Sequence, residues 1–374
     1  MRTVSRIAVT RCLNYESAAV HSAVSGAIGL LGGIDKFVRP SSRVLVKPNL
    51  LMAVAPDSGI VTHPEVVRSV VRQLKGIKCR VFLGDGPSIW GKQAQNTDRV
   101  YETTGMKRLA EEENIELVRF DKQRMFGQLA LTEWLCECDF LVNIPKFKTH
   151  TLMLLSGGIK NLFGLVSEQH KSELHRRYLQ QKEFAGVLAD IYAVAKPALT
   201  VIDGITAIEG DGPGTSGSVR RQGVILAGVD CVALDSALAF IMGVKPEKVF
   251  TNLAASRRGL GTCDLSAVEV LGQPLASVSG RPFDLPVTSF AARIPLFLLE
   301  PLRILMRFKP QVRTRVCSAC GRCQQICPVK AISLKGKYAS VDYSRCISCF
   351  CCQETCPNRA IRIKKNLFAR LAGL

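Results

Sequence analysis

Short apolar runs alternate with amphipathic stretches along the first 284 residues. The apolar runs predict strands at 6–10, 43–50, 79–88, 115–120, 139–146, 198–204 and 223–229. The amphipathic stretches predict helices at 15–31, 64–76, 100–113, 182–195 and 230–242, the last with Asp230 as its N-cap. Continuous apolar strands separated by helices are typical of a parallel sheet that is covered on both faces. We therefore predict that residues 1–284 form an α/β domain with a doubly wound, mostly parallel sheet.

Residues 285–314 have a different pattern and predict a connector. Apolar residues recur there at helical spacing while arginines fall on another face, although Pro295 and Pro301 interrupt the stretch. One interpretation is a helix that packs the last part of the chain onto the α/β domain, and we favour it. The other is a helix lying in a membrane interface, together with the basic tail KKNLFARLAGL.

Residues 315–374 contain two copies of the pattern C-x2-C-x2-C-x3-C-P, 29 residues apart. This is the spacing of a two-cluster bacterial ferredoxin, in which three close cysteines hold one iron–sulfur cube and the fourth reaches the other. Structural zinc sites usually combine two separate C-x2-C pairs and do not need a third cysteine at the same spacing, so the pattern favours iron–sulfur clusters over zinc. We predict a small α+β ferredoxin-like domain with two [4Fe–4S] clusters. One is held by Cys317, Cys320, Cys323 and Cys356, and the other by Cys346, Cys349, Cys352 and Cys327.

The stretch CFCC offers two adjacent thiols, Cys351 and Cys352, for one corner of a cube. Cys352 alone keeps the spacing to Cys349 and Cys356 and aligns with Cys323 of the first copy. We therefore predict that Cys351 is not a ligand.

Composition and charge limit the cellular setting. The seven cysteines outside the two motifs are scattered, which with oxygen-sensitive clusters predicts a reducing cytoplasm and an anaerobic or low-oxygen cell. The sequence contains no signal-peptide core and no apolar stretch long enough to cross a membrane. From residue 285 onward, 16 Lys and Arg stand against 3 Asp and Glu, out of a net charge of +19. Such a charge favours acidic redox partners, whereas nucleic-acid binding is not favoured because aromatic residues do not interleave the basic ones.

Polar residues follow or end several predicted strands, at the sheet edge where open α/β folds bind ligands. Lysines and amides there suit an anion, and carboxylates suit a metal or a proton transfer. We expect Asp203, Glu209 and Asp211 in a glycine-rich loop. The candidate catalytic residues are Lys47, Asp85, Lys146, His150, Lys160, Asp203 and Glu209, and the candidate cofactor-binding residues are Asn49 and Asn161.

Several catalytic motifs are absent from the sequence. It contains no G-x-G-x-x-G after the first strand, no P-loop, no G-x-S-x-G and no H-E-x-x-H. Dinucleotide and P-loop nucleotide sites are therefore not supported. We expect His170 and His175 on the surface of a helix.

Seven motifs in this order resemble a widespread prokaryotic family catalogued as a domain of unknown function, number 362, which is often fused to a two-cluster ferredoxin module. They are KPNLL, THPEVV, LGDGPS, NIPKFKTH, GGIKNLFGLV, VIDGITAIEGDGPG and AGVDCVALDSALA, and the match covers about residues 5–280. The resemblance implies an iron–sulfur protein with a redox role and supplies no substrate. It marks all nine candidates above and Asp230 as motif positions. Cys231 stands where the family commonly has proline.

Two functional hypotheses follow. The first is an iron–sulfur oxidoreductase in which Lys47, Lys146 and Lys160 bind an anionic small molecule. In this scheme Asp85, Asp203 or Glu209 handles protons or a metal. The second is a non-enzymatic electron carrier or docking subunit of a larger redox complex. Both hypotheses include the clusters. A small ligand bound in the α/β domain would support the oxidoreductase, and its absence would support the carrier or docking subunit.

Overall fold

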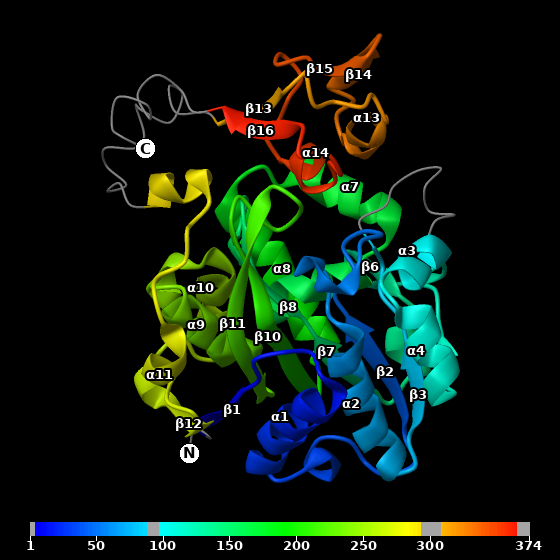
Figure 1. Cartoon of the computed structure of the whole chain (residues 1–374), viewed down its shortest axis with the longest axis vertical. Helices are drawn as coiled ribbons and strands as arrows, with labels where there is room; N and C mark the ends of the chain where they lie inside the picture. Colours follow the sequence, from blue (N-terminus) through cyan, green and yellow to red (C-terminus); the bar gives the residue numbers. More distant parts are fainter. Residues whose placement is uncertain (1–3, 88–96, 293–307, 365–374) are drawn as a thin grey trace.

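One large sheet forms the centre of the α/β domain (Figure 1). The computed structural model describes residues 4–87, 97–292 and 308–364. The strand order is β12 (Val268–Gly272), β1 (Ser5–Arg11), β11 (Gly217–Gly228), β10 (Leu199–Gly210), β7 (Phe140–Ile144), β2 (Arg43–Pro48), β3 (Arg80–Leu83) and β4 (Glu116–Leu117). Along this path every strand is parallel to its neighbour except β11, which is antiparallel to both β1 and β10. The predicted mostly parallel sheet is confirmed.

Two further strands and a hairpin complete the sheet structure of this domain. β8 (Lys146–His150) pairs in parallel with β10, and β9 (Leu154–Ser156) pairs with β8. A separate hairpin is formed by β5 (Gln123–Phe126) and β6 (Leu129–Thr132).

Helices cover both faces of the sheet because alternate residues of each strand point to opposite sides. In β2, Val44 and Val46 belong to the core under α1 and α2, whereas Leu45 belongs to the core under α8. The helices are α1 (Ser17–Leu30), α2 (Pro64–Gly76), α3 (Thr97–Thr103), α4 (Met106–Glu113), α5 (Trp134–Glu137), α6 (Gly158–Asn161), α7 (Glu168–Arg177), α8 (Gln181–Ala195), α9 (Cys231–Ile241), α10 (Phe250–Arg257) and α11 (Leu275–Ser279).

Local signals account for most helix boundaries. Helix α9 starts after Asp230, whose carboxylate accepts hydrogen bonds from the backbone N–H groups of Val232 and Ala233. The single helix predicted at 100–113 is instead two helices. Gly105 separates them with a φ of 78°, a left-handed conformation that a helix interior does not allow.

The expected glycine-rich loop is largely a strand, so that prediction was wrong. Asp203 and Glu209 lie within β10, and Asp211 begins the turn that leads to β11. The backbone of β10 is satisfied by antiparallel pairing with β11 along most of its length, with a bulge between Gly204 and Thr206. The glycines therefore mark a bulge and a turn in a long hairpin.

In the described part of the C-terminal module, residues 308–364, there are four short strands and two short helices. They are β13 (Lys309–Val312), α13 (Arg322–Ile326), β14 (Ile332–Lys335), β15 (Tyr338–Val341), α14 (Cys351–Glu354) and β16 (Ile361–Lys364). Strand β13 pairs with β16, so the last part of the predicted connector belongs to this module. Helix α14 faces the α/β domain beside α7, while the β14–β15 hairpin lies at the far end of the module (Figure 1).

The predicted amphipathic helix falls mainly on residues 293–307 and the basic tail on 365–374, which lie outside the described residues. Within the described ranges, none of the helices combines the length and the apolar character needed to cross a membrane.

Candidate functional site

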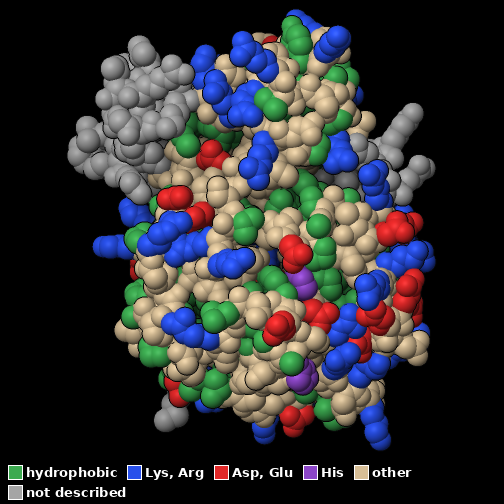
Figure 2. Space-filling model, viewed as in Figure 1, with side chains coloured by type: hydrophobic (Ala, Val, Ile, Leu, Met, Phe, Trp, Pro, Cys, Tyr) green, Lys and Arg blue, Asp and Glu red, His purple; other side chains and the backbone are tan. Residues whose placement is uncertain are grey.

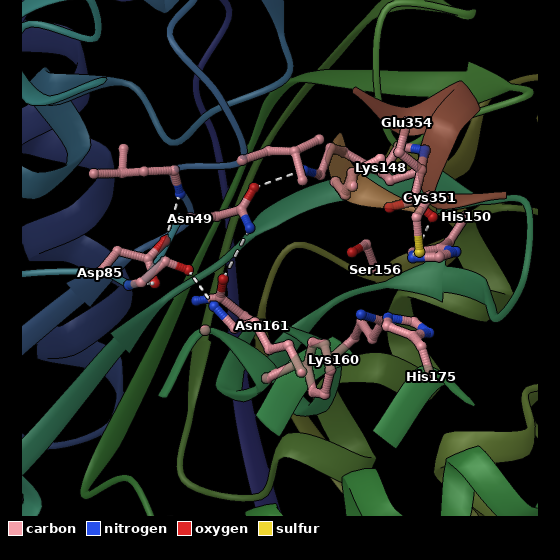
Figure 3. A pocket seen from close by; sticks show the side chains of 18 residues that line it. Asn49, Asp85, Lys148, His150, Ser156, Lys160, Asn161, His175, Cys351 and Glu354 are labelled. Atoms are coloured by element: carbon pink, nitrogen blue, oxygen red, sulfur yellow. Dashed lines mark hydrogen bonds and ion pairs between the residues drawn. The ribbon is translucent and has the colours of Figure 1, made fainter. Parts of the chain in front are cut away.

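A pocket lies between the carboxyl ends of the central strands and the C-terminal module (Figure 3). It encloses about 620 Å³, open solvent at its mouth included. The α/β domain contributes residues that follow β2 and β3 or belong to β8, α6 and α7. The module contributes α14 and the end of α13. The polar lining residues used below are Asn49, Asp85, Lys148, His150, Lys160, Asn161, His175, Cys351 and Glu354.

Two glycines allow α6 to present its side chains to the pocket. The backbone N–H groups of Gly158 and Ile159 donate to the buried carboxylate of Asp235, over distances of 2.5 and 3.1 Å. A Cβ on Gly157 would overlap that carboxylate, and one on Gly158 would crowd Cys231. The SGGIKN motif therefore anchors α6 on α9 and directs Lys160 and Asn161 into the pocket (Figure 3).

A buried ion pair forms the floor of the pocket. The ammonium of Lys47 lies 2.6 Å from Asp85, and both side chains are almost fully buried. Asp85 also accepts hydrogen bonds from the backbone N–H groups of Leu50 and Gly86. A Cβ on Gly164 would overlap both members of the pair, which explains the glycine in the LFG motif. Lys47 is therefore neutralised behind the pocket rather than facing it.

A chain of amides connects the two walls. Lys148 donates to Asn49 Oδ1 over 2.6 Å, and Asn49 donates to Asn161 Oδ1 over 3.0 Å. Asn161 in turn donates to Asn143 Oδ1 over 2.8 Å. Each amide is thereby fixed in orientation, so the polar surface on this side of the pocket is preorganised.

The ammonium group of Lys160 lies beside two aromatic rings that border the pocket. Its ammonium lies 4.5 Å from the ring centroid of Phe163 and 5.8 Å from that of Phe184. Burial lowers the pKa of Lys160, and the carboxyl of Glu354 partly restores it. His175 stacks on Phe184 and is buried, so the expected surface position for this histidine was wrong.

His150 is neutral and has a defined tautomer. Burial, reinforced by Lys160 and Lys148, holds its pKa well below the usual range. Its Nδ1 accepts the backbone N–H groups of Leu152 and Met153, so the ring proton is on Nε2. Nε2 lies 3.6 Å from Glu354 Oε1 in the module.

Two further ionisable groups of the pocket, Lys148 and Glu354, also have strongly shifted pKa values. Burial, followed by repulsion from Lys146, lowers the pKa of Lys148 to about 7. Burial raises the pKa of Glu354 to about 7, although Lys160 and Lys148 oppose that shift. Asp85 is already paired with Lys47, and an anion bound in the cavity would favour the charged forms of Lys148 and Lys160.

The turn between β10 and β11 docks the module on the pocket. Gln353 donates to the carbonyl of Asp211 over 2.8 Å, and Thr215 donates to the carbonyl of Cys356 over 2.6 Å. A Cβ on Gly214 would overlap the carbonyl oxygen of Glu354. The GDGPGT stretch, expected to supply a site loop, thus holds α14 in place.

Replacing Gly214 by alanine is expected to loosen this docking, because the added methyl meets backbone that cannot move without shifting α14. Overpacking of this kind typically costs about 1–3 kcal/mol. Hydrogen–deuterium exchange should accelerate in α14 and in the 211–216 turn, with cluster content unchanged. Gly29→Ala is the matched control, since a Cβ there meets no atom within 4 Å. Equal exchange in both variants would contradict the docking role.

The eight motif cysteines surround two cavities in the module. One, of about 340 Å³, is lined by Cys317, Cys320, Cys323 and Cys356. The other, of about 310 Å³, is lined by Cys327, Cys346, Cys349 and Cys352. We call them cavity I and cavity II. In the described ranges no three His, Cys, Asp or Glu side chains converge on a single-ion site.

Backbone geometry around the two cavities repeats with the sequence and fits a cube held at its corners. Left-handed residues occur in pairs 29 positions apart: Ala319 and Ser348, Gly321 and Phe350, Lys330 and Arg359. The N–H groups of Ala331 and Ala360 donate to Cys327 Sγ and Cys356 Sγ, each over 3.2 Å. Such N–H···S bonds stabilise thiolate charge and tune cluster potentials. Cys351, by contrast, lines the pocket rather than either cavity.

Three candidate site residues lie away from the pocket. Lys146 and Asp203 form a fully buried ion pair of 2.8 Å, bridged by the hydroxyl of Tyr15. Glu209 binds Arg220 and Arg281 and accepts the N–H of Asp284, which ties the chain after α11 to β10. The catalytic roles of these residues remain predictions.

The other candidates come together. Asn49, Asp85, His150, Lys160 and Asn161 line the pocket, with Lys47 directly behind it. The sequence analysis did not assign a site role to Cys351, Glu354 or His175. The two module residues lie more than 180 positions after Lys160, and their sequence context pointed to cluster binding.

Comparisons with known proteins match both parts of the chain. A model of the family described as Domain of unknown function (DUF362) matches residues 44–240, and a model of a 4Fe-4S dicluster domain matches residues 309–357. A thylakoid-associated protein of Synechocystis sp. is 31% identical over 264 residues, which span 69% of this chain and 80% of the relative. The resemblance drawn from the motifs is thereby confirmed, and the module is a 4Fe–4S-binding domain.

Proposed function

Because this chain belongs to the DUF362 family and carries a 4Fe-4S dicluster domain, we propose that it is an iron–sulfur oxidoreductase acting on an anionic small molecule in the pocket under α14. One observation carries the proposal. Adjacent residues of α14 point to different places: Cys352 to cavity II, and Cys351, with Glu354, to the pocket. A molecule in the pocket is then separated from cavity II by a single short helix.

The cysteines of each cavity fit one [4Fe–4S] cluster, and we propose the crossed ligand sets described above. When bound, such clusters supply electrons one at a time. The protein around the pocket binds and positions the molecule that exchanges them. Lys160 and the Lys148–Asn49 pair hold its anionic group, while docked α14 shields it from water.

The test begins with anaerobic purification and mass spectrometry of the small molecules that remain bound. Lys160→Met is expected to weaken retention of an anion about 10- to 150-fold, because losing a charge-assisted hydrogen bond costs about 1.5–3 kcal/mol. Cluster content should not change, since no residue of α6 is among those that line either cavity.

The matched control is Lys182→Met, which removes an exposed lysine from α8 outside the pocket. Equal retention of the anion in the Lys160 and Lys182 variants would mean that the pocket lysine does not bind it. A protein that copurifies with no small molecule, and binds none in an anaerobic metabolite screen, would contradict the proposed enzyme.

That outcome would favour the second candidate, a non-enzymatic carrier or docking subunit. Its support is the name of the Synechocystis relative, which describes that protein as thylakoid-associated. In this case the α/β domain would bind a partner at a membrane surface and the module would relay electrons.

A further inference from the structure

The two cavities of the module differ in their exposure to solvent. Five residues that line cavity I are exposed: Ser318, Cys320, Leu334, Pro357 and Asn358. Every residue that lines cavity II is buried or half-buried. Cavity II also adjoins α14, which closes the pocket, and the start of the β14–β15 hairpin at Ile332. Leu334 and Ala339, further along that hairpin, line cavity I, and the hairpin lies at the far end of the module (Figure 1). The module therefore has an outer and an inner redox position.

The exposed residues at and beside cavity I include three cations and two large apolar side chains. We define the cavity I face as the exposed residues that line this cavity or lie within two positions of a cysteine or exposed residue that lines it. Its distinctive members are Arg315, Val316, Leu334, Lys335 and Arg359. Val316 and Leu334 are each 40% exposed, so the face presents apolar side chains as well as cations.

The module as a whole is also rich in basic residues. Residues 308–364 contain eleven Lys and Arg but two acidic residues, Asp342 and Glu354. Glu354 faces the pocket, and Asp342 accepts hydrogen bonds from Ser344 after β15. Figure 2 shows Lys and Arg side chains gathered over the module, with few acidic groups among them. A surface with many cations and few carboxylates is complementary to an acidic protein surface.

We propose that the cavity I face is the docking surface for a small acidic one-electron carrier protein of the ferredoxin class. Electrons pass between that carrier and the outer position, and between the outer and inner positions within the module. The proposal rests on the two-cluster part of the proposed function and is independent of any substrate in the pocket. Each transfer moves one electron: the carrier is oxidised by one electron and the module is reduced by one.

The test measures reduction of the purified holoprotein by a pre-reduced plant-type [2Fe–2S] ferredoxin, an acidic carrier, in an anaerobic stopped-flow instrument without substrate. The variant carries Arg315→Glu, Lys335→Glu and Arg359→Glu. The control carries Lys330→Glu, Arg345→Glu and Lys364→Glu, which are exposed and do not border cavity I. Lys330 and Arg359 occupy the same position of the two sequence repeats, so the charge change is matched.

At low ionic strength the first variant is expected to lose about tenfold or more in second-order rate constant, and most of its salt dependence. The control should stay within about twofold of the wild type. Iron content confirms that both variants retain their clusters. A loss as large in the control, equal rates in all three proteins, or a wild type that ferredoxin does not reduce would each overturn the proposal.

A lipid surface could also be attracted to a basic face, so the same variants are sedimented with phosphatidylserine-containing vesicles. Vesicle binding that is lost in the first variant while its reduction rate is unchanged would assign the face to a membrane and overturn the proposal. Failure of the docking test leaves anion retention in the pocket unaffected, so the two proposals can fail separately.

Discussion

Replacing Lys146 by methionine is expected to lower the free energy of unfolding by about 3–5 kcal/mol, because it leaves a buried carboxylate without its cation. Lys146 and Asp203 are both fully buried, and their charged atoms lie 2.8 Å apart. Asp203 also accepts hydrogen bonds from the hydroxyl of Tyr15 and the backbone N–H of His63, so the pair joins the start of α1 and α2 to β8 and β10. Methionine keeps the length of the side chain and removes the charge.

Urea unfolding of the anaerobic protein, followed by circular dichroism, would measure this effect as a lower midpoint. The double variant Lys146→Met, Asp203→Asn should recover much of the loss, since it removes the unpaired charge. Lys160→Met serves as a control that should change anion retention more than stability. A Lys146→Met protein of wild-type stability that no longer retains the anion would restore the sequence-based hypothesis that Lys146 binds the ligand.

The different positions of Lys146 and Lys160 show which features of the site can be predicted from the sequence and which cannot. Strand-end placement brought Asn49 and Asp85 to the right edge of the sheet, because parallel strands share that edge. Which lysine faces the pocket depends on partners distant in sequence: Asp85 neutralises Lys47, and Asp203 neutralises Lys146. Lys160 has no carboxylate within ion-pair distance among the described residues. No local pattern distinguishes these cases.

The fold, like the site, could be predicted only in part from the sequence. Continuous apolar runs and amphipathic helices sufficed for the parallel sheet, since each depends on local periodicity. The β10–β11 hairpin was missed because its pairing satisfies a backbone whose glycines resemble those of a loop. The docking of α14 was missed for a related reason: Gly214 makes room for a carbonyl oxygen of another domain, and a backbone contact leaves no side-chain signature.

Replacing a single ligand cysteine by serine is also expected to have a large effect, because each ligand belongs to one particular cluster. Cys352→Ser is expected to lose the cluster at cavity II, and Cys356→Ser the cluster at cavity I, leaving about four irons per chain in each variant. The assignment for Cys356 is the informative one. It lies in the second sequence repeat but lines the cavity of Cys317, Cys320 and Cys323.

Cys351→Ser is the matched control for Cys352→Ser, since the two residues are adjacent on α14 and both are buried. It should keep about eight irons per chain, because Cys351 lines the pocket and not a cavity. Iron and sulfide analysis would give the cluster content, and low-temperature electron paramagnetic resonance of the reduced proteins would identify the surviving cluster. If Cys351→Ser reproducibly lost half its iron while Cys352→Ser kept all of it, the second motif would bind its cluster one residue out of register. The pocket would then lose Cys351 from its wall, and the separation of α14 into a cluster side and a pocket side, on which the proposed function depends, would not hold.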